Sequence, residues 1–175
     1  LPDYGWKRIE CDARVEAQDD VSTTGRANPS ECILPDVFLA ALKRLNPQVE
    51  EGVLQGILRN FRKDYTATDM VETNYKLYNQ LRNGIKKPVR KNGKEDFDIV
   101  RLIDFDHPER NDFHCVNQMW IKGHYRYRRP DVLLFVNGLP VVFIELKNST
   151  VKVEESYNKN LTSYRKDIPN IFSFN

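Results

Sequence analysis

The chain has 175 residues, of which 40% are hydrophobic and 30% are charged, and its formal net charge is +2. This size and apolar content suit one globular domain with its own core rather than two. No apolar run is long enough to cross a bilayer and the first residues lack the features of a signal peptide, so we expect a cytoplasmic protein. The three cysteines, Cys11, Cys32 and Cys115, form no Cys-x-x-Cys pair, which argues against a disulfide framework or a cysteine zinc site.

The first half of the chain shows the periodicity of helices. Segment 21–30 is rich in Ser, Thr, Gly, Asn and Pro, and is predicted to be an exposed loop. Apolar residues then recur with a helical period over 35–45, 49–61 and 70–81. Three amphipathic helices are therefore predicted.

The second half changes to short strand-like runs. These runs cover residues 97–105, 113–121, 131–136 and 141–146. Since residues 141–144 are apolar on both faces, we expect them to lie inside a sheet. A polar surface helix is expected over 157–166, and a final strand over 171–174. The predicted fold class is α/β, of the α+β kind, with helices packed on a central mixed sheet.

Basic residues gather in two segments, although the net charge is too small to identify a nucleic-acid-binding protein by itself. The two groups comprise Lys86, Lys87, Arg90, Lys91 and Lys94, and Arg126, Arg128 and Arg129. The second group is interleaved with tyrosines and precedes a Pro-Asp step. It fits either a solvated strand end or a surface that contacts phosphates.

Two carboxylates and an amine occur at strand spacing around one hairpin. Asp131 opens the run that leads to an Asn-Gly turn, and Glu145 and Lys147 end the returning run. Carboxylate oxygens suit Mg²⁺, and a neighbouring ammonium suits a water and a phosphate under attack, so the pattern indicates a nuclease. The other interpretation of Glu145 and Lys147 is a solvated pair at a strand end.

The length of the hairpin loop decides whether the carboxylates share a face of the sheet. A two-residue loop at the Asn-Gly step would turn them to opposite faces. A three-residue loop over 136–138, with Gly138 at positive φ, would pair Asp131 with Phe143 and keep Glu145 on the same face. We predict the three-residue loop.

Other chemistries have weaker support. A second possible metal site consists of Asp104, Asp106, His107, Glu109, Asp112 and His114. These residues lack a standard zinc spacing and lie where polar turn residues are expected in any case. The chain has no Walker-type glycine loop, so no ATP site is expected in it.

Around the hairpin, the sequence resembles the N-terminal nuclease domain of the R (restriction) subunit of type I restriction endonucleases, within the PD-(D/E)xK superfamily. The central match is Arg-Pro-Asp-Val-Leu-Leu-Phe-Val-Asn-Gly-Leu-Pro at 129–140, which leads into Ile-Glu-Leu-Lys at 144–147. Further matches are 42–47, the region of Asn74, 102–105 and Asn117-Gln118. The resemblance covers most of the chain and implies a restriction-endonuclease-like core.

The resemblance implies roles for the hairpin residues in the cleavage of double-stranded DNA. Asp131 and Glu145 would bind Mg²⁺, with the Leu146 carbonyl as a further candidate ligand. Lys147 would position or activate the attacking water.

The resemblance also implies DNA contacts. The family carries a Gln and a Tyr four residues apart on the helix after the hairpin; here Tyr164 fits, but Asn160 replaces the Gln and has a shorter reach. Arg128 and Arg129, beside the Pro-Asp step, complete the candidate DNA-binding set.

The implied partners are those of a larger complex. In the family, an ATP-driven translocase follows the nuclease domain, and the subunit assembles with methyltransferase and specificity subunits. We therefore expect residues 1–175 to form a single nuclease domain, as the N-terminal fragment of a longer subunit. The alternative is a degenerate domain that keeps the fold and acts only as an interaction module.

Overall fold

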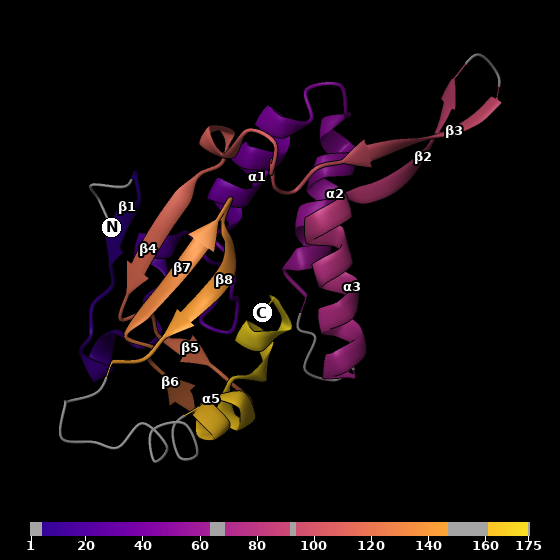
Figure 1. Ribbon diagram of the computed structural model, residues 1–175. Helices are drawn as coiled ribbons and strands as arrows, with labels where there is room; N and C mark the ends of the chain where they lie inside the picture. Colours follow the sequence, from indigo (N-terminus) through magenta and orange to yellow (C-terminus); the bar gives the residue numbers. More distant parts are fainter. Residues whose placement is uncertain (1–4, 64–68, 92–93, 147–160, 175) are drawn as a thin grey trace.

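A computed structural model describes residues 5–63, 69–91, 94–146 and 161–174. Its centre is a four-stranded sheet with the strand order β1-β4-β7-β8 (Figure 1). The strands are β1 (Lys7–Glu10), β4 (Phe113–Asn117), β7 (Val132–Val136) and β8 (Leu139–Ile144). β1 runs parallel to β4, whereas the β4–β7 and β7–β8 pairs are antiparallel. The predicted mixed sheet is therefore confirmed.

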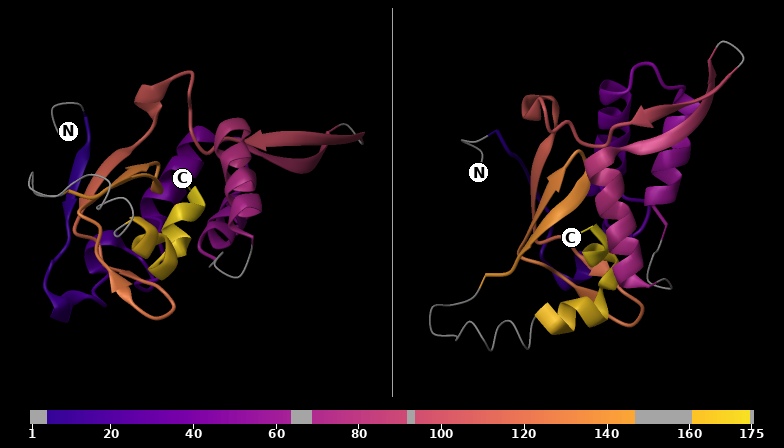
Figure 2. Two further views of the ribbon diagram at one scale, coloured as in Figure 1. Left: turned by 60° about the horizontal axis from the view of Figure 1, so that its bottom comes forward. Right: turned by 45° about the vertical axis from the view of Figure 1, so that its right-hand side comes forward.

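The three predicted amphipathic helices are present. They are α1 (Pro35–Leu45), α2 (Glu51–Phe61) and α3 (Met70–Asn83). Asp69 begins α3 by accepting hydrogen bonds from the Val71 and Glu72 amides at 2.8 and 3.2 Å, which satisfies two amides that have no partner within the helix. The helices gather on one side of the four-stranded sheet (Figure 2).

The main core forms between these helices and the sheet. Buried apolar side chains from α1, α2, β4 and β7 belong to one cluster, which includes Phe38, Leu54, Val116, Leu133 and Phe135. Burial of such side chains is worth about 1.5–3 kcal/mol each relative to exposure. The apolar stripes found in the sequence are therefore the faces that hold the helices against the sheet.

A separate two-stranded ribbon corrects the strand predicted over 97–105. The ribbon consists of β2 (Ile85–Lys91) and β3 (Lys94–Val100), and it projects away from the helices (Figure 1). The predicted strand is right only up to Val100, and the basic segment before it is also a strand. Opposite charges pair across the ribbon, as in Lys87 facing Asp98, and this cross-strand pairing is not visible in an apolar pattern.

The run predicted over 113–121 divides into two strands. β4 ends at Asn117, and the chain turns before β5 (Ile121–Lys122), which pairs with β6 (Tyr127–Arg128). Strand β8 forms the edge of the described sheet, and Val142 is 41% exposed, so the expectation that 141–144 lie inside the sheet is wrong here.

The end of the chain differs from the predicted strand at 171–174. The described part of the predicted surface helix is α5 (Thr162–Asp167), and a 3₁₀-helix over Pro169–Phe174 follows it. Ile168, Ile171 and Phe174 are all buried. Their spacing of three residues matches the turn of a 3₁₀-helix, so burial against the core selects this conformation over a strand.

The predicted loop at 21–30 is irregular, and half of its residues are exposed, but Thr24 and Arg26 are buried. The loop includes a short 3₁₀-helix, Ser22–Thr24. Two further short 3₁₀-helices lie elsewhere in the chain, at Val15–Ala17 and Pro108–Arg110. The buried Arg26 donates hydrogen bonds to Thr24 Oγ1 at 2.8 Å and to the Glu31 carbonyl at 3.1 Å. All three cysteines are free thiols, as predicted. Among the described residues, no helix combines the length and apolarity needed to span a bilayer.

Candidate active site

The β7–β8 hairpin turns through two residues, so the predicted three-residue loop is wrong. Val136 pairs with Leu139, and both residues between them have positive φ, 50° at Asn137 and 79° at Gly138. This is the conformation in which an Asn-Gly turn matches the twist of two antiparallel strands. Only the positive φ of Gly138 was predicted.

Buried contacts select this turn. The Asn137 side chain donates to the Leu102 carbonyl and accepts from the Asp112 amide, both at 2.8 Å. The Gly138 carbonyl accepts a 2.8 Å hydrogen bond from the Leu34 amide. A Cβ at Gly138 would lie 2.5 Å from the Leu34 carbonyl oxygen, so helix α1 packs where only glycine fits.

A β-bulge compensates for the two-residue turn. The register shifts by one position between Leu134 and Phe135: Leu134 pairs with Val142, whereas Phe135 pairs with Pro140. The last pair at the open end of the hairpin is Val132 with Ile144. Asp131 and Glu145 are the next residues beyond that pair on the two strands. Asp131 was predicted to face Phe143; when the register is continued one position beyond Val132 and Ile144, Asp131 lies opposite Glu145 instead. The bulge therefore keeps the two carboxylates on one face of the sheet, as the three-residue loop was expected to do.

Two hydrogen bonds fix the Asp131 carboxylate. The Leu146 amide donates to Oδ2 at 2.7 Å, and Gln118 Nε2 donates to Oδ1 at 3.1 Å. Each carboxylate oxygen can accept more than one hydrogen bond or ligand, so both retain a lone pair for a cation. Together with the neighbouring Glu145, Asp131 supplies the hard oxygen donors that suit Mg²⁺. The described residues thus fit a divalent cation.

Tyr164 of α5 lies beside both carboxylates. Burial, the charge of Glu145, a hydrogen bond with that carboxylate and the charge of Asp131 together raise the pKa of Tyr164, and the opposing effect of the Arg128 charge is smaller. The residue is only 7% exposed, and its ring meets the Phe143 ring edge-on, with the ring centroids 5.0 Å apart. The carbonyl oxygen of Arg129 is a second acceptor within reach of the hydroxyl, at 3.2 Å. Tyr164 is therefore a buried, protonated phenol next to the carboxylate pair.

The two arginines beside the Pro-Asp step make contacts within the domain. Arg128 forms an ion pair with Asp167 at 2.5 Å, and its guanidinium lies 5.4 Å from the Tyr164 ring. Arg129 donates to the Ala13 carbonyl and lies over the Trp120 ring at 5.2 Å. Of the two, Arg128 lies next to the carboxylate pair, through its contact with Tyr164, whereas the Arg129 side chain packs on Trp120. Of the other predicted site residues, Lys147 and Asn160 lie outside the described residues.

Gln118 was missed as a site residue by sequence reasoning. In the sequence, Gln118 stands out only as part of the Asn117-Gln118 match to the family. No local pattern connects it with Asp131, which is 13 positions away. Its backbone has a φ of 56°, which is uncommon for a residue other than glycine, asparagine or aspartate. That conformation is visible only in the structure.

The second possible metal site does not form. The buried Asp104 accepts a hydrogen bond from the His107 amide and pairs with Arg110 at 3.0 Å. Asp112 pairs instead with Arg44 and Lys7, at 2.8 and 3.1 Å. Within the described ranges, no group of three or more His, Cys, Asp or Glu side chains could hold a metal ion. These residues hold the loop before β4 in place.

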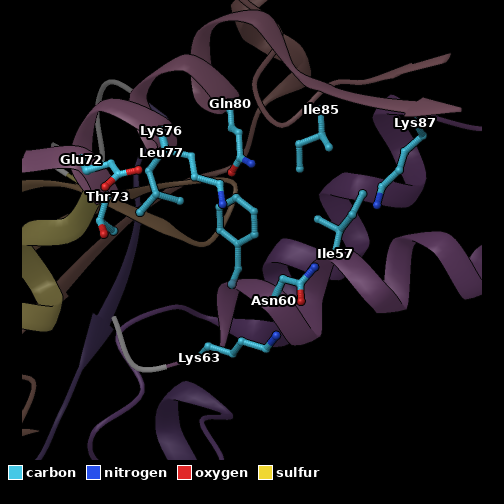
Figure 3. Close-up of a pocket in the computed structure, with 11 residues that line it drawn as sticks. Ile57, Asn60, Lys63, Glu72, Thr73, Lys76, Leu77, Gln80, Ile85 and Lys87 are labelled. Carbon is cyan, nitrogen blue, oxygen red and sulfur yellow. The ribbon is translucent and has the colours of Figure 1, made fainter. Parts of the chain in front are cut away.

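A hollow of about 460 Å³ lies between α2, α3 and β2 (Figure 3). Lys63, Lys76 and Lys87 line it together with Glu72, while neither Asp131 nor Glu145 reaches it. It lacks paired carboxylates and so does not suit the metal chemistry expected of the hairpin. The open end of the β7–β8 hairpin remains the best candidate for an active site.

The chain is similar to a known family and to several known proteins. A family profile described as "Type I restriction enzyme R protein N terminus" matches residues 1–175. The chain is 32% identical over 154 residues to the type I restriction enzyme HindI endonuclease subunit of Haemophilus influenzae. It is 31% identical over 157 residues to the putative type I restriction enzyme MjaIXP endonuclease subunit of Methanocaldococcus jannaschii.

These alignments cover 86% and 85% of the chain, but the chain spans only 14% and 15% of the length of the two relatives. The chain therefore matches about one seventh of each of these much larger endonuclease subunits.

Proposed function

The chain belongs to the family of type I restriction enzyme R protein N termini, and on that basis we propose that it is the nuclease domain of such a subunit and cleaves double-stranded DNA. The main support is the placement of Asp131 opposite Glu145 at the open end of the hairpin, with Asp131 fixed by the Leu146 amide. Two oriented carboxylates at a strand end suit metal-assisted phosphodiester hydrolysis.

In this proposal, Asp131, Glu145 and the Leu146 carbonyl hold Mg²⁺, and Lys147 positions the attacking water. A bound Mg²⁺ would supply charge stabilisation to the phosphate under attack and lower the pKa of a water ligand. The chain's own contribution is to keep two negatively charged groups close together. The two carboxylates repel each other, and the hydrogen bonds from Leu146 and Gln118 to Asp131 offset part of this repulsion.

Tyr164 has a positioning role in this proposal. Its buried hydroxyl lies next to Glu145, so it limits the orientations of that carboxylate. Arg128, Arg129, Asn160 and Tyr164 form the proposed DNA-binding set. Because Arg128 already pairs with Asp167, its contact with a phosphate would require that pair to open or to be shared.

The wider function depends on parts beyond this domain. We infer that residues 1–175 form one domain of a longer cytoplasmic subunit, in which a translocase hydrolyses ATP and moves DNA. The methyltransferase and specificity subunits would supply sequence recognition, so this domain would need only phosphate contacts and a metal. Its small net charge of +2 agrees with a domain that makes few phosphate contacts of its own.

The proposal is tested by Mg²⁺ calorimetry on the full-length subunit and by plasmid cleavage with the assembled enzyme. Asp131→Ala and Glu145→Ala should each remove one class of Mg²⁺ sites and abolish cleavage. Asp106→Ala is the matched control, because it removes an exposed carboxylate of the rejected metal site. Unchanged Mg²⁺ binding in both hairpin variants would reject the nuclease assignment in favour of a degenerate interaction module.

A further inference from the structure

Gln118 stands at the end of β4, next to the strand that carries Asp131. Strand β4 pairs with β7 up to Asn117 and Val132, and Gln118 is the next residue of the chain. Its φ of 56° lies in the left-handed region, which is unfavourable for a long side chain. Such a conformation persists when the contacts around the residue favour it.

Gln118 binds Asp131 twice. Its backbone amide donates to the Asp131 carbonyl at 3.1 Å, and its side-chain Nε2 donates to Asp131 Oδ1, also at 3.1 Å. One residue thus fixes both the main chain and the carboxylate of Asp131. The Leu146 amide fixes the other oxygen, Oδ2, at 2.7 Å. The carboxylate plane is therefore held from both sides.

The chemistry of the glutamine side chain suits this role. Its NH₂ group can only donate, and it carries no charge that would compete with a cation for Asp131. A hydrogen bond to a carboxylate is charge-assisted and hence stronger than one between neutral groups. Residues that orient a metal-binding carboxylate in this way commonly change metal affinity when they are replaced.

We propose that Gln118 is a positioning residue that orients Asp131 for the divalent cation, an inference that rests on the function proposed above. A purely structural role is the alternative, in which only the backbone hydrogen bond at the end of β4 matters. Side-chain substitutions separate the two, since the backbone amide is present in every variant.

The test compares variants of the full-length subunit by Mg²⁺ calorimetry and urea unfolding. Gln118→Met keeps the length of the side chain and removes the donor. Gln118→Asn keeps an amide but is one methylene shorter, and asparagine tolerates the left-handed conformation well. Each variant should weaken Mg²⁺ binding by about 10- to 100-fold with little change in the urea midpoint. Gln48→Glu, at an exposed position, is the control and should bind like the parent.

A second readout is the Mg²⁺ dependence of plasmid cleavage by the assembled enzyme. A positioning defect should be overcome by raising free Mg²⁺, whereas Asp131→Ala should stay inactive at every concentration. If a folded Gln118→Asn subunit binds Mg²⁺ like the parent while Asp131→Ala does not, the positioning role is overturned and the nuclease assignment stands. If Asp131→Ala also binds Mg²⁺ like the parent, both the positioning role of Gln118 and the nuclease assignment are rejected.

Discussion

The Leu146 amide donates a 2.7 Å hydrogen bond to Asp131 Oδ2, beyond the last paired residues of the β7–β8 hairpin. This contact joins the two arms of the hairpin at the point where the candidate metal ligands lie. It involves the backbone of Leu146, a residue that is 64% exposed. The identity of this residue therefore matters less than the presence of its N–H group.

Replacement of Leu146 by proline removes that N–H group. We expect Leu146→Pro to weaken Mg²⁺ binding by about tenfold or more, because a fixing contact of Asp131 is lost. Leu146→Ala retains the amide and should bind Mg²⁺ like the parent. Calorimetry on the two variants checks this, and equal affinities would show that the amide does not organise the site.

Gly138 should tolerate no side chain. An added Cβ would lie 2.5 Å from the Leu34 carbonyl oxygen and 2.7 Å from the Phe38 nitrogen, so Gly138→Ala forces helix α1 away from the hairpin. Gly5→Ala is the matched control, because Gly5 also has a positive φ but a Cβ added there would meet nothing within 4 Å. Urea unfolding should show a loss of about 1 kcal/mol for Gly5→Ala and clearly more for Gly138→Ala. Similar losses would mean that the turn can shift.

Asn137 should be needed for its side chain as well as for its backbone conformation. Asn137→Gly keeps the positive φ accessible but leaves the Leu102 carbonyl and the Asp112 amide without their buried partner. The expected loss of unfolding free energy is about 2–3 kcal/mol, measured by urea unfolding. A loss below about 0.5 kcal/mol would indicate that water replaces the amide.

The raised pKa of Tyr164 gives stability a defined pH dependence. The folded state holds the phenol proton more tightly than the unfolded state, whose tyrosine pKa is ~10. This contribution is fully present below pH ~10 and is lost as the pH rises above it. The unfolding free energy of the parent, measured by urea unfolding, should therefore fall more steeply above pH ~10 than that of Tyr164→Phe. Parallel curves would show that Tyr164 titrates normally.

The Arg128–Asp167 ion pair predicts opposite effects of two substitutions on DNA binding. If Arg128 contacts a phosphate, Arg128→Ala should weaken binding to all sequences and reduce the salt slope by about 1. Asp167→Asn releases the guanidinium from its partner and should strengthen binding. Fluorescence anisotropy over a salt series measures both. Equal affinities for the parent and both variants would remove Arg128 from the DNA-binding set.

Features that depend on local patterns could be predicted from the amino-acid sequence. The three helices follow from apolar periodicity, and helix α1 was predicted with its observed bounds. The positive φ of Gly138 follows from turn chemistry, and the residues of the hairpin identified the family, which the comparisons confirm. These features depend on neighbours within a few positions of the chain, and such neighbours are visible in a sequence.

Tertiary structure alone decided the geometry of the candidate site. A two-residue turn alone would place Asp131 and Glu145 on opposite faces of the sheet. The bulge shifts the register by one residue and so brings Asp131 opposite Glu145. Gln118 reaches Asp131 only because β4 pairs with β7, and Ile171 and Phe174 adopt a 3₁₀-helix because the core buries them at that spacing. Each of these outcomes depends on packing between distant segments, and that packing selects among local conformations of similar free energy.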